Sequence, residues 1–167
     1  MRLRLLFTFL FIAMLATTGT AALADAPDRA FMARLSGADE VPGVETDAWG
    51  HAVFNLSNGG TELRYRLIVH NIVDVRMAHI HLAPAGVNGP VVVWLYPDAP
   101  PAQLIPGRFD GVLGEGTITA ANLVGPLAGM TLEDLLAEMS AGNAYVNAHT
   151  VENPGGEIRG QIGSLNP

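Results

Sequence analysis

The stretch HAVFNLSNGGTELRYRLIVHNI, residues 51–72, indicates the kind of fold. Every second residue is apolar in its first arm, 52–56, and the same alternation runs through the second arm, 63–69. Asn58 and Gly59 stand between the two arms. Two alternating runs that flank Asn-Gly are a strong short-range signal for an antiparallel hairpin. The sequence therefore predicts a β-hairpin here, with one face of each arm in the core.

Short runs of the same kind lie on both sides of this hairpin, separated by segments rich in Gly, Pro, Asn and Asp. The apolar run PVVVWLYP, residues 90–97, is typical of a strand buried on both faces, with a dimer contact as the alternative. Three glycines in DGVLGEGTI, residues 110–118, indicate bulges or a close approach of backbone. The other predicted strands cover residues 29–36, 76–82, 144–150 and 157–163.

One helix is predicted, over TLEDLLAEMSAG, residues 131–142. Thr131 is its expected N-cap, Asp134 follows three positions later, and Gly142 stands at its end. About eight short strands with one short helix in a crossover connection favour an all-β fold over any βαβ arrangement. We expect a single antiparallel Greek-key sandwich or barrel.

The first 24 residues have the features of a secretory signal peptide. Arg2 and Arg4 precede an apolar run over residues 5–16, and the segment ends in Ala-Leu-Ala before Asp25. We therefore expect a signal peptide at 1–24, a β domain at 25–167, and a secreted or periplasmic location. No second apolar segment of about 20 residues follows, so we do not expect a membrane-embedded protein.

Charge and cysteine content limit the function. The expected mature chain keeps seven of the nine basic residues and all 16 acidic ones, a net charge of −9. Such an acidic protein is a poor binder of nucleic acid. The chain has no cysteine, so a metal site would need histidine, carboxylate, methionine or backbone oxygen ligands.

The histidines form the most suggestive pattern. His79 and His81 alternate with apolar residues in the predicted strand 76–82, so both point to the face opposite the core. His149 has the same facing in the strand 144–150 and joins the pair if the two strands are neighbours. Three neutral imidazoles with an open position suit copper or zinc. The alternative is a set of exposed polar histidines with no metal.

Weaker candidates lie on polar faces of other strands. His51 and His70 are more simply explained as surface residues. Glu157 and Arg159 share one face of the last strand, and whether either approaches His149 depends on a register that the ENPGG turn leaves open. Their simpler reading is a surface ion pair. Three methionines are better explained as core filling than as copper ligands: Met77, Met130 and Met139.

Several blocks of the sequence together resemble the CHRD domain, named from the growth-factor antagonist chordin. They are AHIH (78–81), AGVNGPVVV (85–93) and AYVNAHTVENPGGEIRGQI (144–162). The opening ARLSGADEVP (33–42) is also similar to the start of that family. The resemblance covers essentially the whole expected mature chain. It implies a domain widespread in bacterial exported proteins and says little about activity.

A fainter resemblance concerns the order of parts in Cu/Zn superoxide dismutase. It implies that His79, His81 and His149 are copper ligands and that Arg159 guides a small anionic substrate. The sequence departs from that enzyme because no histidine lies between His81 and His149 and no disulfide can form. The bridging histidine and the zinc loop are therefore missing, which leaves at most a mononuclear copper site.

Two hypotheses follow. The first is an exported metal-binding protein with copper, or zinc, at His79, His81 and His149, extended in its bolder form to redox chemistry on superoxide or another small molecule. The second is a non-catalytic module in which loops such as residues 37–50 bind an extracellular protein or polysaccharide and the histidines are structural. No GxSxG or phosphate-binding loop supports a hydrolase or a nucleotide site.

Overall fold

The computed structural model describes residues 29–57 and 59–165, so the predicted signal peptide lies outside the described residues. This part of the chain is mostly β, with one α-helix, α1 (Leu132–Ser140), and three 3₁₀ turns, η1 (Gly37–Asp39), η2 (Ala120–Asn122) and η3 (Gly125–Leu127). Its strands are β1 (Ala30–Ser36), β2 (Trp49–Leu56), β3 (Leu63–Leu82), β4 (Val91–Tyr96), β5 (Ile105–Ile118), β6 (Ala144–Thr150), β7 (Ile158–Gln161) and β8 (Gly163–Ser164).

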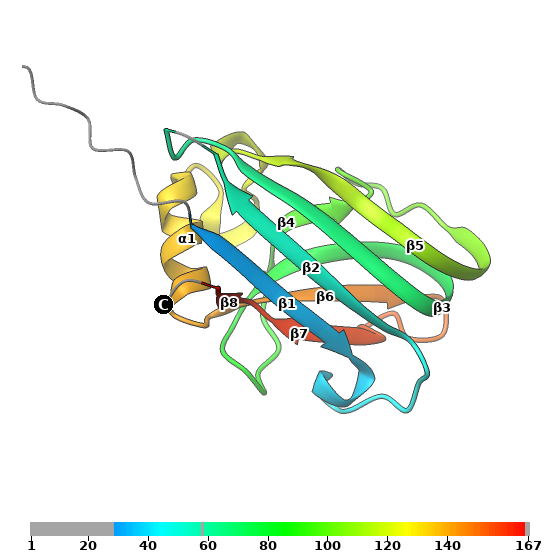
Figure 1. Ribbon diagram of the computed structural model, residues 1–167. Helices are drawn as coiled ribbons and strands as arrows, with labels where there is room; N and C mark the ends of the chain where they lie inside the picture. The colour runs from blue at the N-terminus through cyan, green and yellow to red at the C-terminus, as the bar shows by residue number, and fades with distance from the viewer. Residues whose placement is uncertain (1–28, 58, 166–167) are drawn as a thin grey trace, which may run out of the picture.

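The long strand β3 organises the fold (Figure 1). Its first half pairs with β2 and β5, and its second half pairs with β4 and β6. Between the halves, Asn71 and Asp74 have φ of 58° and 51°, a conformation that Asn and Asp tolerate better than most residues. The sequence predicted the second arm of the hairpin and the strand at 76–82 as separate elements. In the structure they form one strand, β3, because the chain bends without leaving the sheet.

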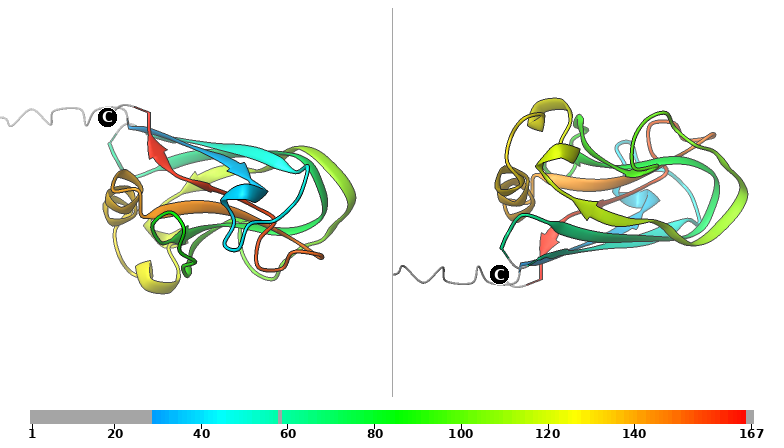
Figure 2. Two further views of the ribbon diagram at one scale, coloured as in Figure 1. Left: turned by 90° about the horizontal axis from the view of Figure 1, so that it is seen from below. Right: turned by 90° about the horizontal axis from the view of Figure 1, so that it is seen from above.

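The sheet closes on itself. Its strands follow the order β2-β1-β7-β6-β3-β4, with a further pairing between β2 and β3 and with β5 beside β3. Neighbours that are distant along the chain, such as β1 and β7, give the crossover connections of a Greek key. Figure 2 shows two curved layers that enclose the core, with α1 across one end. The predicted all-β antiparallel fold is confirmed.

The predicted hairpin is present, with Leu56 opposite Leu63 across the β2–β3 pair. Its apolar face lies in the core, where Phe54, Leu63 and Leu67 are fully buried. The predicted helix is also confirmed at its ends. Thr131 caps α1, with a reciprocal capping box to Asp134, and Gly142 follows the helix with φ of 73°.

β5 is longer than predicted, since it begins at Ile105. The glycines act as expected. The register against β3 shifts between Leu67 and Ile68, and a Cβ on Gly114 would collide with the carbonyl oxygen of Leu95.

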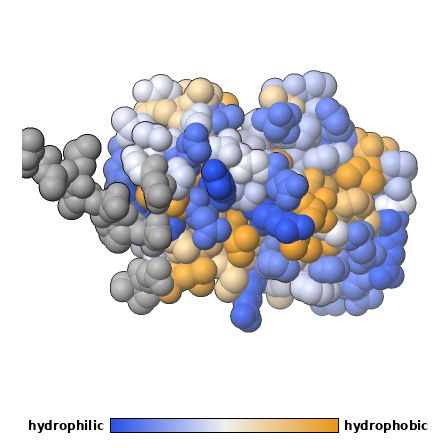
Figure 3. Space-filling model, turned by 45° about the horizontal axis from the view of Figure 1, so that its top comes forward, coloured by the Kyte–Doolittle hydropathy of each residue, from blue (hydrophilic) through white to orange (hydrophobic). Residues whose placement is uncertain are grey.

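The prediction that the apolar run at 90–97 is buried on both faces is wrong. β4 pairs with β3 alone among the described strands, and Val91, Trp94 and Tyr96 are only half-buried. The indole of Trp94 instead covers the ring of His79. Figure 3 shows apolar surface between polar areas on one side of the molecule. Within the described residues, no helix is long and apolar enough to cross a membrane.

Candidate metal centre

Pairing between β3 and β6 brings the predicted histidines together. The two strands are antiparallel neighbours, with His79 opposite Asn147 and Met77 opposite His149. Directly opposed residues share one face of a sheet, so His79, His81 and His149 all lie on the side away from the core. The apolar residues between them, such as Ile80 and Val146, are fully buried in the core. We call the three histidines the triad.

The triad is buried, which corrects the expectation of a polar face at the surface. His79, His81 and His149 are 3%, 8% and 5% exposed. Three loops cover them: residues 37–48 after β1, residues 83–90 after β3, and residues 151–157 after β6. In Figure 1 the first two hang below the sheet, and the side chain of Asn88 donates to the carbonyl oxygen of Val41 at 2.7 Å to join them.

The imidazole nitrogens converge. One ligand nitrogen from each member of the triad lies within 4.8 Å of the other two. Nδ1 of His79 is 3.1 Å from Nε2 of His149. The ring of Trp94 meets the ring of His79 edge-on, with centroids 4.3 Å apart, and excludes water from that side.

Backbone carbonyls orient two of the rings. Nδ1 of His81 lies 2.9 Å from the carbonyl oxygen of Gly89, and Nδ1 of His149 lies 3.2 Å from that of Pro154. A carbonyl oxygen only accepts, so each Nδ1 carries the proton and each Nε2 keeps a lone pair for a ligand. In the bond between His149 and His79, the proton therefore belongs to Nδ1 of His79. Nε2 of His79 and Nε2 of His81 are buried without a hydrogen-bond partner.

Burial keeps the triad neutral. Together with the neighbouring imidazoles, it lowers the pKa of His79 to about 3 and that of His149 to about 4. Burial also lowers the pKa of His81, against the opposing effect of its bond to Gly89. All three rings therefore present lone pairs at neutral pH. Neutral imidazole is the form that binds copper and zinc, so this donor set fits either ion.

Arg159 lies close to the triad but is fully engaged with the protein. It is 1% exposed, and its guanidinium carbon stands 3.5 Å from the centroid of the Tyr145 ring. Its terminal nitrogens donate to Asn88 Oδ1 at 3.2 Å and to the carbonyl oxygens of Pro84 and Val87 at 3.2 and 2.9 Å. Arg159 thus ties the 83–90 loop to β7. Its predicted part as an anion guide stays a prediction.

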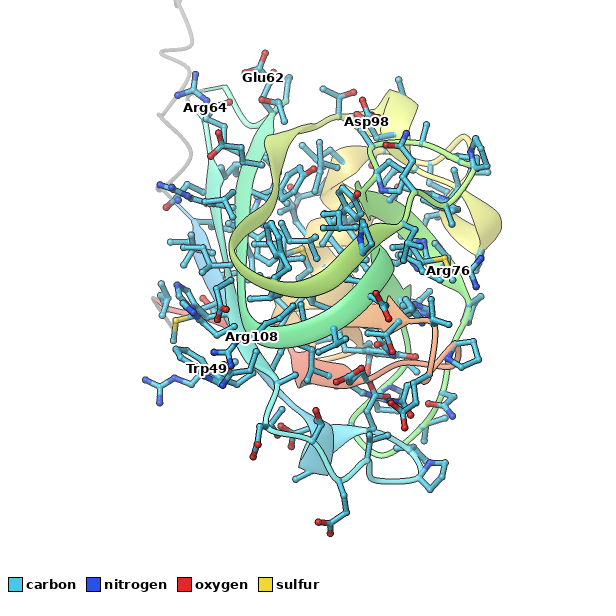
Figure 4. All side chains as sticks on the ribbon, turned by 90° about the vertical axis from the view of Figure 1, so that its right-hand side faces the viewer. Trp49, Glu62, Arg64, Arg76, Asp98 and Arg108 are labelled. Carbon is cyan, nitrogen blue, oxygen red and sulfur yellow. The ribbon has the colours of Figure 1, made fainter. Side chains whose placement is uncertain are left out.

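Of the weaker candidates, His51 and His70 lie apart from the triad. His51, on β2, pairs with Ile68 on β3, and His70 stacks on Trp49 with ring centroids 4.2 Å apart. Figure 4 shows Trp49 and Arg108 together at one edge of the molecule. Glu157 is buried and accepts from Thr46 Oγ1 at 2.7 Å. Met139 fills the core as predicted, whereas Met130 is exposed and Met77 is half-buried beside His149.

Sequence reasoning missed two residues around the triad, Glu40 and Trp94. Glu40 belongs to the first covering loop, and Trp94 lies in a strand that was expected to be wholly buried. No periodic pattern marks either of them, because their proximity depends on how distant segments pack. Asn147, which accompanies His149 on β6, contacts Glu40 through a 3.4 Å hydrogen bond from Nδ2 to Oε2.

Comparison with known proteins agrees with the blocks quoted from the sequence. No curated protein and no solved structure matches the chain. The resemblance to Cu/Zn superoxide dismutase thus gains no support from these comparisons and concerns the order of parts alone. The family model of the CHRD domain matches residues 31–162, a span that includes the triad, Arg159 and all three covering loops. The chain therefore belongs to the CHRD domain family.

Proposed function

We propose that this protein binds one transition-metal ion, copper in preference to zinc, through His79, His81 and His149. The observation that carries the proposal is the pair of buried Nε2 atoms, on His79 and His81, that no protein group satisfies. Buried polar atoms in folded proteins normally have partners. A metal ion would satisfy both nitrogens, and it would take the lone pair of His149 Nε2 in place of the hydrogen bond from His79 Nδ1.

The donor set supports copper first. Three neutral nitrogens and no thiolate suit either ion, and nitrogen sites generally bind Cu²⁺ more tightly than Zn²⁺. Three protein ligands also leave a coordination position open. Bound copper would supply one-electron chemistry, and the protein would supply a site shielded by Trp94 and the covering loops.

Redox chemistry on superoxide or another small molecule is the narrower form of this proposal. It requires that a substrate reach the open position. Arg159 already donates to three acceptors in the 83–90 loop. These contacts support a role in holding that loop in place more than a role in guiding a substrate. We also propose that the chain is exported, on the strength of residues 1–24.

A non-catalytic binding module is the second candidate. Membership of the CHRD family and the triad are both compatible with a module of this kind. The bonds from His81 to Gly89 and from His149 to Pro154 are compatible with a structural use of these rings, as they are with metal ligation. They do not account for the unpartnered Nε2 atoms, which is why we place metal binding first.

Metal titration of the purified mature protein tests the proposal. We expect about one equivalent of Cu²⁺ with a nitrogen-rich electron paramagnetic resonance spectrum, and a higher Tm with copper than with chelator, because a ligand of the native state stabilises it. A His79→Ala, His81→Ala double variant loses this binding. The control is a His51→Ala, His70→Ala double variant, which removes the same number of imidazoles and keeps it. Equal copper binding by the two variants would reject the triad.

A further inference from the structure

A pocket of about 270 Å³ opens where the three covering loops meet. Residues 40–44 form one wall, Asn88 a second, and residues 152–156 the third. Its charged lining residues are Glu40 and Glu152, and no arginine or histidine lines it. A pocket with acidic walls concentrates cations and repels anions.

Glu40 lies at the inner end of this pocket. It is 7% exposed, and its Oε1 has no hydrogen-bond partner. Asn147, 2% exposed, also has an unpartnered oxygen, Oδ1. A Cβ on Gly156 would stand 2.6 Å from Glu40 Oε1 and 2.5 Å from Asn147 Oδ1. Two unsatisfied oxygens thus approach the same glycine, and the absence of a side chain there leaves room for both.

The pocket and the triad share their walls. Pro154 lines the pocket, and its carbonyl oxygen accepts from His149. Asn88 also lines it, next to Gly89, which accepts from His81. Asn147 lies directly opposite His79 in the β3–β6 register. Glu40, which lines the pocket, contacts Asn147, which is paired with His79, so these two residues connect the pocket wall to the triad.

The charges around Glu40 are few. Arg159 lowers its pKa and Asp39 raises it, but burial is the largest influence and raises the pKa to about 7. Glu152 adds a second carboxylate to the pocket wall.

We propose that this pocket is the route by which a metal cation reaches the triad, and that Glu40 Oε1 and Asn147 Oδ1 are the oxygen atoms that receive the ion on the way. This inference rests on the proposed function of the triad and adds the entry site and its chemistry. Hard oxygen ligands hold a hydrated divalent ion weakly compared with imidazoles, so the ion passes on to the nitrogens.

The rate of metal loading tests the entry site. Stopped-flow quenching of tryptophan fluorescence by Cu²⁺, measured in a Trp49→Phe background that leaves Trp94, follows arrival at the triad, because the Trp94 ring lies 4.3 Å from the His79 ring. Glu40→Gln should load at least about tenfold more slowly and reach the same final stoichiometry. Glu40→Asp keeps the carboxylate and should load at nearly the wild-type rate. Glu45→Gln removes an exposed charge from the same loop and is the control. Loading of Glu40→Gln within twofold of this control would overturn the inference.

A second measurement does not depend on the triad. Mn²⁺ prefers oxygen ligands and broadens nearby NMR signals. Substoichiometric Mn²⁺ should broaden the amide signals of Gly155 and Gly156 in the wild type and in Glu45→Gln, and not in Glu40→Gln. Unchanged broadening in Glu40→Gln would overturn the entry site. If copper binding fails altogether, the proposed function fails and the Mn²⁺ result alone decides on the pocket.

Discussion

Strand β3 carries histidines in two settings. His70, in its first half, stacks on Trp49, which is itself 48% exposed, and lies 3.6 Å from a carboxylate oxygen of Asp110. His79 and His81, in its second half, are buried, and each has an unpartnered nitrogen. The alternation of side chains is the same in both halves.

The difference comes from what covers each half. The first half presents its polar face to solvent. The second half lies under three loops, and Arg159 holds one of them in place. Solvent satisfies an exposed imidazole, whereas a buried one needs a protein group or a ligand. The triad is therefore buried, with unsatisfied nitrogens, because loops from distant parts of the chain cover it. The strand alone does not determine this.

Loss of Arg159 should have the largest effect, because this residue holds a loop that covers the second half of β3. Arg159→Leu removes every hydrogen bond from the guanidinium to the 83–90 loop and leaves the carbonyl oxygens of Pro84 and Val87 without this donor. We expect the free energy of unfolding in urea to fall by about 3–5 kcal/mol. Arg108→Leu is the matched change in the exposed region, where the side chain is 65% exposed beside Asp110, and it should cost under about 1 kcal/mol. Similar losses in the two variants would contradict the role of Arg159.

Gly156 offers a sharper test of the packing above the triad. Its φ is 136°, and a Cβ there would stand 2.5 Å from the side chain of Asn147. Gly156→Ala should therefore cost about 2–4 kcal/mol in unfolding free energy, from backbone strain and overpacking together. Gly107 has a φ of 76°, but a Cβ on it would meet nothing within 4 Å, so Gly107→Ala reports strain alone, about 1 kcal/mol. Equal costs would show that the space beside Asn147 is not tight.

The third test concerns the pH dependence of stability in the metal-free protein. The pKa values of His79 and His149, about 3 and 4, lie below the ordinary value of 6.5, so the unfolded chain binds more protons and stability is lost as pH falls below 6.5. Glu40, with its pKa raised from 4.5 to about 7, acts oppositely and is most stabilising at low pH.

From pH 7 to pH 5, His79, His149 and Glu40 together should cost the wild type a net of about 2 kcal/mol. His81, whose pKa burial also lowers, adds to this loss in the wild type and in the variant below. Glu40→Gln lacks the opposing group and should lose about 4 kcal/mol over the same range. Urea unfolding at the two pH values measures both losses. A Glu40→Gln profile parallel to the wild type would show that Glu40 is not held as a neutral acid.

Much of the fold was predictable because it depends on local patterns. Alternation and Asn-Gly predicted the β2–β3 hairpin, and Thr131, Asp134 and Gly142 marked the ends of α1. Alternation also predicted that His79 and His81 share a face. The pairing of β3 with β6, which brings in His149, depends on long-range topology that periodicity does not contain. The family resemblance supplied what the pattern alone could not.

Burial was the part that local patterns could not predict. An alternating strand has one polar face, and that face is normally solvated. Here all seven residues of β6 are buried, because the loops fold back over it. Glu40 likewise has no local sequence pattern that predicts its contact with Asn147, which lies more than 100 positions further along the chain.

The three-loop pocket also has a consequence for how such domains can diverge. Each wall comes from a different connection, while the triad stands on paired strands that lie beneath. Loops tolerate insertions and substitutions far better than the strands that they join. Altered lengths in residues 40–44 or 152–156 would therefore change what enters while the imidazoles keep their places. Related proteins with the same strands can therefore admit different ligands. The loop segments can also be exchanged one at a time by design.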